Sequence, residues 1–267
     1  MRTDERATAG FAGWSDVRLI LRQARFEQLG FWLNPLAAIF TIGFSLVFLV
    51  MIGLSAGSSR VDFLGNIKLI QYYVPGFVSY GVMAACFTTL AITVVNRREA
   101  GLLKRLRLSP VPTWVLLGAL FLSTLAVTVV QVVLVLVVGR VAFGVHPPGH
   151  AAAFAIALVV GGMSFTALGV GMSTVIPNAD AAGPVTSVVF FVLLFLSGLW
   201  FPIKSGSGLA QISSVFPIRH FITAVFDSFD PQHGSPWAWN DLLVVAGWGV
   251  VGTVVAIRRF QWAPRRG

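Results

Sequence analysis

Residues 114–138 read WVLLGALFLSTLAVTVVQVVLVLVV and contain no charged side chain. Because a helix needs about 20 apolar residues to cross the ~30 Å hydrocarbon layer of a bilayer, this stretch alone indicates a membrane-spanning segment. Five further stretches are equally free of charge: 34–54, 73–95, 151–176, 184–202 and 242–257. The sequence therefore predicts an all-α integral membrane protein in which six transmembrane helices form a single domain over residues 1–267.

The composition and the distribution of charge agree with a membrane protein. Of the 267 residues, 56% are hydrophobic and 11% are charged, whereas a soluble domain carries about 25% charged residues. With the amino terminus placed inside, fourteen of the nineteen Lys and Arg lie in cytoplasmic segments, as the retention of basic residues on that side predicts. Topology thus explains the net charge of +9 without nucleic acid as a partner.

The cellular location follows from the same pattern. Sixteen Arg against three Lys, with abundant Ala, Gly and Val, is typical of a GC-rich bacterial genome. We therefore expect a multi-pass protein of the bacterial plasma (inner) membrane, with its N and C termini in the cytoplasm.

Residues 11–33 are charged yet periodic. Trp14 begins an apolar arc at helical spacing, and Arg18, Arg22 and Arg25 fall together beside that arc. This pattern predicts an amphipathic interface helix in the headgroup layer, with the arginines reaching membrane lipid phosphates. A fraying basic tail is the alternative.

The segment 97–110 joins the second and third predicted spans and combines positive charge with an apolar face. Arg98 and Arg105 point away from that face at helical spacing. The leucines that share the face are Leu102, Leu103 and Leu106. A loop that only fixed topology would need the charge but not the leucines, so this segment is predicted to dock on a partner.

Residues 203–240 hold two apolar segments, Leu209–Phe216 and Ile218–Phe229, that are separated by Pro217. Each is too short to cross a bilayer. They predict an external helical hairpin between spans five and six, either as interfacial helices or as a hairpin that dips into the membrane from outside. The fourth span is rich in Gly, Ala and Ser, which predicts close packing against neighbouring helices.

Several absences limit the chemistry of the chain. The sequence has no Gly-Lys pair, so it lacks the phosphate-binding loop that P-loop ATPases require. The predicted spans hold no ionisable residue for a proton relay, and all four histidines lie in predicted outer loops. We therefore expect no catalytic, cofactor-binding or metal site, and a membrane body that draws its energy from a partner.

Three motifs carry a family resemblance. They are Tyr73-Val-Pro-Gly-Phe77, Arg98-Glu99-x-Gly101-Leu-Leu-Lys-Arg-Leu106-x-x-x-Pro110, and Ser197-Gly-Leu-Trp-Phe-Pro202 followed by Phe216-Pro217. Their order and spacing resemble the permeases of type 2 ABC exporters over nearly the whole chain.

The resemblance implies an assembly rather than an enzyme. Two permease copies, as a homodimer or a related heterodimer, would associate with two copies of a cytoplasmic ABC ATPase that binds the ATP and Mg. Segment 97–110 would be the coupling helix, with Glu99 as an anion near a helix start and Gly101 allowing close backbone approach.

The predicted substrate is hydrophobic or amphipathic: a drug, antibiotic, lipid or related natural product, as in multidrug or antibiotic resistance. The candidate path residues are aromatic and uncharged: Phe77, Phe87, Phe190 and Phe195. A polysaccharide or lipid-linked glycan exporter is an alternative, since aromatic faces also stack on sugars.

Two other classes of function remain at this stage. An intramembrane lipid-modifying enzyme would need polar groups at membrane depth, for which the spans offer only neutral candidates such as Gln131, Ser164 and Thr166. A membrane scaffold without transport is the other. Co-purification with a neighbouring ATPase would separate both from the exporter.

Overall fold

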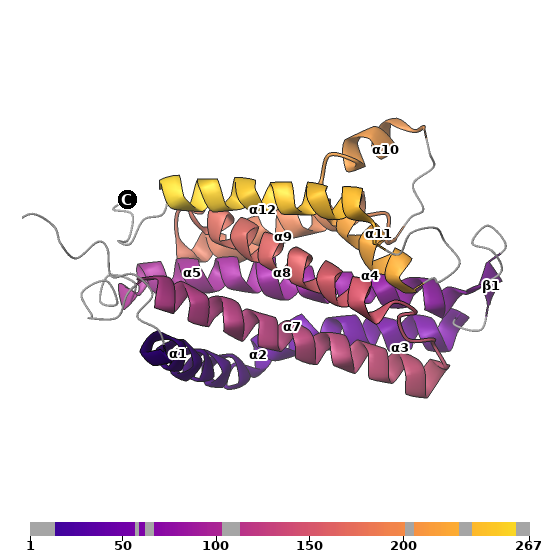
Figure 1. Cartoon of the computed structure of the whole chain (residues 1–267), viewed down its shortest axis with the longest axis horizontal. Helices are drawn as coiled ribbons and strands as arrows, with labels where there is room; N and C mark the ends of the chain where they lie inside the picture. Colours follow the sequence, from indigo (N-terminus) through magenta and orange to yellow (C-terminus); the bar gives the residue numbers. More distant parts are fainter. Residues whose placement is uncertain are drawn as a thin grey trace, which may run out of the picture.

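The computed structural model describes residues 14–56, 59–61, 67–102, 113–200, 206–229 and 237–259. Nearly all of these residues are helical, and the long helices run side by side as one elongated bundle (Figure 1). We call its two ends the α1 end, where helix α1 (Trp14–Trp32) lies, and the β1 end, where strand β1 (Arg60–Val61) lies.

Five helical segments in the described part of the chain are long and apolar enough to cross a membrane. They comprise the second span, most of α7 (Thr113–Phe143), α8 (Ala151–Ser173), α9 (Ala179–Leu196) and α12 (Trp239–Arg259). Apolar stretches without charge form helices here because a helix satisfies all its backbone hydrogen bonds internally, as hydrocarbon requires. The all-helical membrane fold predicted from the sequence is thus confirmed.

The first predicted span is helical but less regular. It consists of α2 (Pro35–Ala38), the π-helix η1 (Ile39–Gly43) and α3 (Phe44–Ala56). Its apolar helical part, Thr41–Ser55, is shorter than the five spanning segments. The predicted count of six crossings therefore stays a prediction for this segment.

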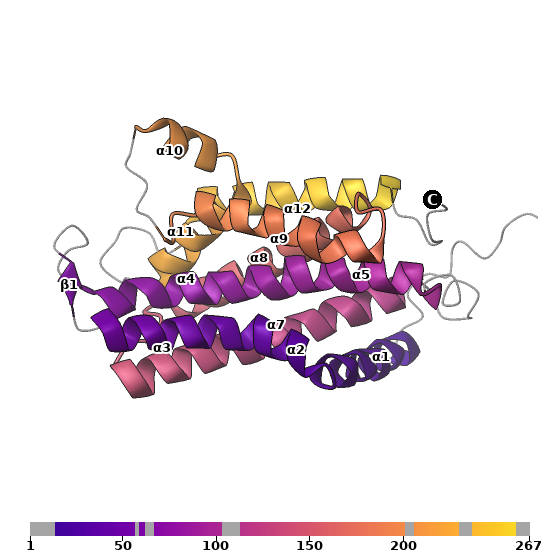
Figure 2. The same ribbon diagram turned by 180° about the vertical axis from the view of Figure 1, so that it is seen from behind.

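The second span lies at the centre of the bundle. It runs through α4 (Leu69–Met83), the π-helix η3 (Ala84–Thr89) and α5 (Leu90–Glu99) as one segment of 31 residues. Its most apolar window is 78% buried, against 22–44% for the other four spans. Figure 2 shows it between α3 and α9, so this span packs against helices on both sides.

The small residues of α8 allow close helix contacts, as predicted. A Cβ added at Gly169 would lie 2.8 Å from the carbonyl oxygens of Cys86 and Phe87 in η3. A Cβ added at Gly252 of α12 would lie 2.7 Å from the backbone nitrogen of Leu168. Glycine at these positions lets backbones meet where lipid supplies no hydrophobic drive for association.

Two short helices, α10 (Gly208–Ser213) and α11 (Pro217–Phe229), connect α9 to α12 at the β1 end, and α10 projects from the bundle beyond α12 (Figure 1). His220 Nδ1 of α11 lies 2.5 Å from Asp241 Oδ1 of α12, and Trp248 Nε1 donates to the carbonyl of Val215 at 2.7 Å. These contacts fasten α11 to the bundle. At the same end, Arg60 pairs with Lys68 between β1 and β2 (Ile67–Lys68).

Candidate coupling site

Helix α1 lies against α7 at the α1 end and forms the outer wall of the site. Its inward face holds Ala24, which is buried, and Gln28, which is half-buried. Gln28 Nε2 donates to the carbonyl and hydroxyl oxygens of Ser123 at 2.5 and 3.0 Å. The helix predicted at 11–33 is thus present over Trp14–Trp32, although residues 11–13 and the Trp14 side chain lie outside the described part. The headgroup location remains a prediction.

The outward face of α1 carries both charge and apolar groups. Its three predicted lipid-binding arginines, Arg18, Arg22 and Arg25, are all exposed. Leu21 and Phe26 beside them are 55% and 58% exposed. A helix that exposes arginines and large apolar side chains together suits the boundary between headgroups and hydrocarbon.

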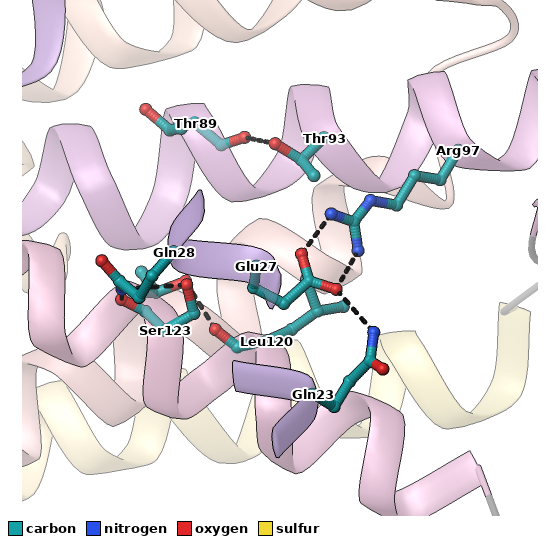
Figure 3. Close-up of polar contacts among 9 residues, drawn as sticks. Gln23, Glu27, Gln28, Thr89, Thr93, Arg97, Leu120 and Ser123 are labelled. Atoms are coloured by element: carbon teal, nitrogen blue, oxygen red, sulfur yellow. Dashed lines mark hydrogen bonds and ion pairs between the residues drawn. The ribbon is translucent and has the colours of Figure 1, made fainter. Parts of the chain in front are cut away.

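A bidentate ion pair joins α1 to the end of α5. Both terminal nitrogens of Arg97 donate to the carboxylate of Glu27, one of them at 2.8 Å, and Gln23 Nε2 donates to the same carboxylate at 3.2 Å (Figure 3). The Glu27 side chain is only 9% exposed and that of Arg97 24%. A bidentate arginine–carboxylate pair fixes the orientation of the two side chains as well as pairing their charges.

The next residue, Arg98, reaches a different neighbour. Its side chain is 2% exposed and its guanidinium donates to the carbonyl oxygens of Ser173 at 3.0 Å, Ile176 at 2.7 Å and Pro177 at 3.2 Å. These carbonyls belong to the C-terminal end of α8 and the turn that leads into α9. A cation at a helix C-terminus is favoured there by the helix dipole.

Arg97 and Arg98 together form what we call the two-arginine junction. Successive residues of a helix are 100° apart, so one side chain can point to α1 while the other points to the α8–α9 turn. Val95, Ile176 and Ala182 add an apolar contact between α5 and that turn. The junction therefore fastens three segments together at the residue where the predicted docking loop begins.

The loop leaves α5 through a left-handed glycine. Gly101 has φ +67°, and its backbone nitrogen donates to the carbonyl of Arg98 at 3.1 Å, which ends the helix as such glycines commonly do. The prediction assigned close backbone approach to Gly101, yet nothing in the described chain lies within 4 Å of an added Cβ. The positive φ is the stronger requirement.

Only the first part of the predicted coupling segment is described. Glu99 is the last residue of α5, three positions before Leu102, which is 41% exposed. Leu103, Arg105 and Leu106, with the rest of 103–110, lie outside the described residues. Arg98 was grouped with the outward-pointing basic residues, but its burial shows that it holds the loop base in place instead.

The sequence analysis missed Arg97 and Glu27. A signal was present, because Glu27 lies three residues after Ala24 and four before Phe31 on the face of the helix that is otherwise apolar. An acid on an apolar helical face requires a cationic partner. Nothing in the sequence alone identified that partner as Arg97.

The predicted substrate-path residues fall into two groups. Phe77, Phe87 and Phe190 are at most 5% exposed and belong to the central apolar core. Phe195 is 56% exposed on the outer face of α9, beside the equally exposed Phe191. Of the four predicted path residues, therefore, only Phe195 has an exposed side chain within one chain.

The neutral polar residues of the alternative enzyme hypothesis are not assembled into one site. Gln131 of α7 donates to Ser45 of α3 at 3.2 Å and to the carbonyl of Phe77 at 3.3 Å. Ser164 of α8 instead packs against Gly249 of α12. Gln131 and Ser164 therefore contact different helices, and these two candidates do not form one catalytic cluster.

A bundle of apolar helices around a central second span, with α5 fastened at its end by Arg97 and Arg98, defines a helical membrane protein with several spans. The family follows from comparison with known proteins. The family model described as ABC-2 family transporter protein matches residues 61–258, more than half of the chain, and the chain belongs to this family. The resemblance found in the three motifs is thereby confirmed.

Individual relatives are more distant. The chain is 24% identical over 178 residues to the probable multidrug ABC transporter permease YbhR of Escherichia coli K12, covering 66% of this chain and 48% of the relative. It is also 24% identical over 196 residues to the putative transport permease YvfS of Bacillus subtilis, covering 72% of this chain and 78% of the relative. The chain thus spans about half the length of YbhR.

Proposed function

We propose that this chain is the membrane-spanning subunit of an ATP-driven ABC exporter. The two-arginine junction carries the proposal, because it joins the base of the 97–110 loop rigidly to α1 and to the α8–α9 turn. A partner that moves the loop would then move three segments of the bundle together. Such a rigid contact is what transmission of a conformational change requires.

The assembly in this proposal has two permease copies and two cytoplasmic ABC ATPase subunits, which supply the ATP and Mg. All six apolar segments cross the membrane, the α1 end faces the cytoplasm, and the β1 end with α10 and α11 faces outward. Support comes from the excess of Lys and Arg in the segments assigned to the cytoplasmic side and from the family membership.

The cargo is a hydrophobic or amphipathic molecule such as a drug, antibiotic, lipid or related natural product. Two observations support this class. The spans offer an aromatic and uncharged surface, of which Phe191 and Phe195 are the exposed members on α9. The similarity to YbhR, whose printed name is probable multidrug ABC transporter permease, points in the same direction.

A matched pair of substitutions tests the proposal. Leu102 at the loop base is 41% exposed and Leu209 of α10, at the opposite end, is 37% exposed. The chain would be co-expressed with an ABC ATPase encoded beside it, purified, and assayed for ATPase activity and drug-stimulated turnover. We expect Leu102→Asp to reduce co-purification or stimulation at least tenfold, because a desolvated carboxylate would oppose an apolar contact.

Leu209→Asp serves as the control and should leave both readouts unchanged, since it lies at the β1 end. Equal loss in the two variants would indicate general destabilisation. If the wild-type chain fails to associate with any ABC ATPase, or if Leu102→Asp couples normally, the proposed function is wrong.

A further inference from the structure

A cavity of about 290 Å³ lies between α1, α7 and the η3–α5 part of the second span, and Glu27 and Arg97 are among the residues that line it. Its lining runs from Arg97 to Ala85 along the second span, roughly 18 Å at 1.5 Å per residue. The coupling site accounts for the ion pair but not for the cavity that the pair helps to line. Figure 3 shows the polar residues that border this region.

Besides the ion pair, the polar lining of the cavity consists of the amides of Asn34 and Asn96 and of hydroxyl groups that lie along helices otherwise suited to hydrocarbon. Thr93 Oγ1 donates its proton to the carbonyl of Thr89 at 2.7 Å, and Thr124 Oγ1 donates to the carbonyl of Leu120 at 2.9 Å. A hydroxyl whose proton is already donated offers only lone pairs to a ligand. These two groups are therefore hydrogen-bond acceptors.

The carboxylate of Glu27 adds to this acceptor character. A carboxylate has about four lone-pair sites, and Glu27 uses two for Arg97 and one for Gln23. Among the described residues, one acceptor site of Glu27 remains without a donor. Because both terminal nitrogens of Arg97 are directed at Glu27, the pair is net neutral, and Glu27 offers a ligand its remaining acceptor site and not an unmatched charge.

The size of the cavity limits what it can hold. Pockets for drug-sized ligands occupy about 300–1,000 Å³, so a cavity of about 290 Å³ lies at the lower end of that range and suits a small molecule or the head of a larger one. Phe31, Leu90 and Val127 supply apolar lining beside the hydroxyls. An attached hydrocarbon chain would remain in the lipid outside.

We propose that this cavity binds the amine-bearing head of an amphipathic molecule. The ammonium group pairs with Glu27 and donates hydrogen bonds to the hydroxyl oxygens of Thr93 and Thr124. The inference deepens the proposed function by naming the chemistry of its cargo, and rests on it only in treating the ligand as cargo. Binding itself needs neither the ATPase nor transport.

The experiment measures binding to the full-length chain in phosphatidylcholine nanodiscs, with no ATPase present. Tritiated dodecylamine is the probe, and empty nanodiscs give the background from partition into lipid. Dodecanol and dodecyl phosphate, of equal chain length, are the neutral and anionic comparisons. We expect saturable binding of the amine, at least tenfold tighter than that of either comparison, because hydrogen bonds to charged groups exceed those between neutral groups.

The variants Thr93→Val and Thr124→Val remove the acceptors while keeping side-chain shape, and each should weaken dodecylamine binding about tenfold. Thr253→Val is the matched control. Thr253 also donates to its own helix, to the carbonyl of Gly249 at 2.9 Å, but it lies on α12 away from the cavity. Its substitution should leave the Kd unchanged.

Each alternative outcome overturns the inference. Equal binding of dodecanol would show that no charge is recognised, and tighter binding of dodecyl phosphate would make Arg97 an anion site. Unchanged affinity in both Thr93→Val and Thr124→Val would place the ligand elsewhere. A chain that binds dodecylamine as expected but never stimulates an ATPase would instead contradict the proposed function alone.

Discussion

The substitution Arg98→Lys tests whether the base of the loop is held as the structure indicates. The Arg98 guanidinium donates to three carbonyl oxygens, and the compact ammonium of lysine cannot reproduce that fork. Two of the three hydrogen bonds should be lost. At about 1.5 kcal/mol each, the low end for hydrogen bonds to charged groups, the junction loses ~3 kcal/mol.

Hydrogen exchange measures this loss where it occurs. The amides of Thr174 and Val175 donate to the carbonyls of Gly171 and Met172 and are protected while the α8–α9 turn is closed. Since about 1.4 kcal/mol is a factor of ten, ~3 kcal/mol predicts roughly 100-fold faster exchange at these amides through local opening. Mass spectrometry of the purified chain, over peptides that cover 170–180, would resolve the change.

The control and the refuting result are equally specific. Arg258→Lys alters an exposed arginine near the end of α12 and should leave exchange at 170–180 unchanged. In complex with the ATPase, Arg98→Lys should retain association but lose much of the drug-stimulated turnover. Wild-type exchange rates at Thr174 and Val175 in the lysine variant would refute the mechanical role given to Arg98.

Two further predictions concern the same end of the molecule. A double-mutant cycle with Glu27→Gln and Arg97→Gln should give a coupling free energy of about 1–3 kcal/mol in thermal or denaturant unfolding. This is below the ~3–5 kcal/mol lost when a fully buried pair is broken, because both side chains are partly exposed. A coupling free energy near zero would contradict the ion pair. Substituting Cys86, the single native cysteine, with Ser gives a cysteine-free background. In it, Leu102→Cys should react with an impermeant maleimide only after the cells are opened, whereas Leu209→Cys should react in intact cells. The reverse pattern would contradict the proposed topology.

The sequence predicted the spans well, and the reason is physical. Hydrocarbon excludes charge and requires internal backbone hydrogen bonding, so composition alone marks where helices such as α7 and α8 must lie. Close packing of α8 was also predictable, because glycine in a membrane helix has few other uses. Both properties depend on the local sequence and not on which helix lies beside which.

The site was predicted less well because it depends on tertiary neighbours. Helical periodicity placed Arg98 on the outward side of the docking segment, but the end of α8 packs beside α5 and buries it. The same limit hid the partner of Glu27, which lies seventy residues along the chain. Gly101 shows a third case, since its φ of +67° could not be separated from close packing by sequence alone.

The ion pair belongs to two features at once, which has a thermodynamic consequence. Arg97 and Glu27 line the cavity and also join α1 to α5 at the residue before Arg98. If an amine bound at Glu27 weakens the ion pair between Glu27 and Arg97, the ligand favours a state in which α1 and α5 are less tightly joined. Linkage then requires the reverse, so a partner that tightens the junction through the loop must lower the affinity of the cavity for the amine by the same factor.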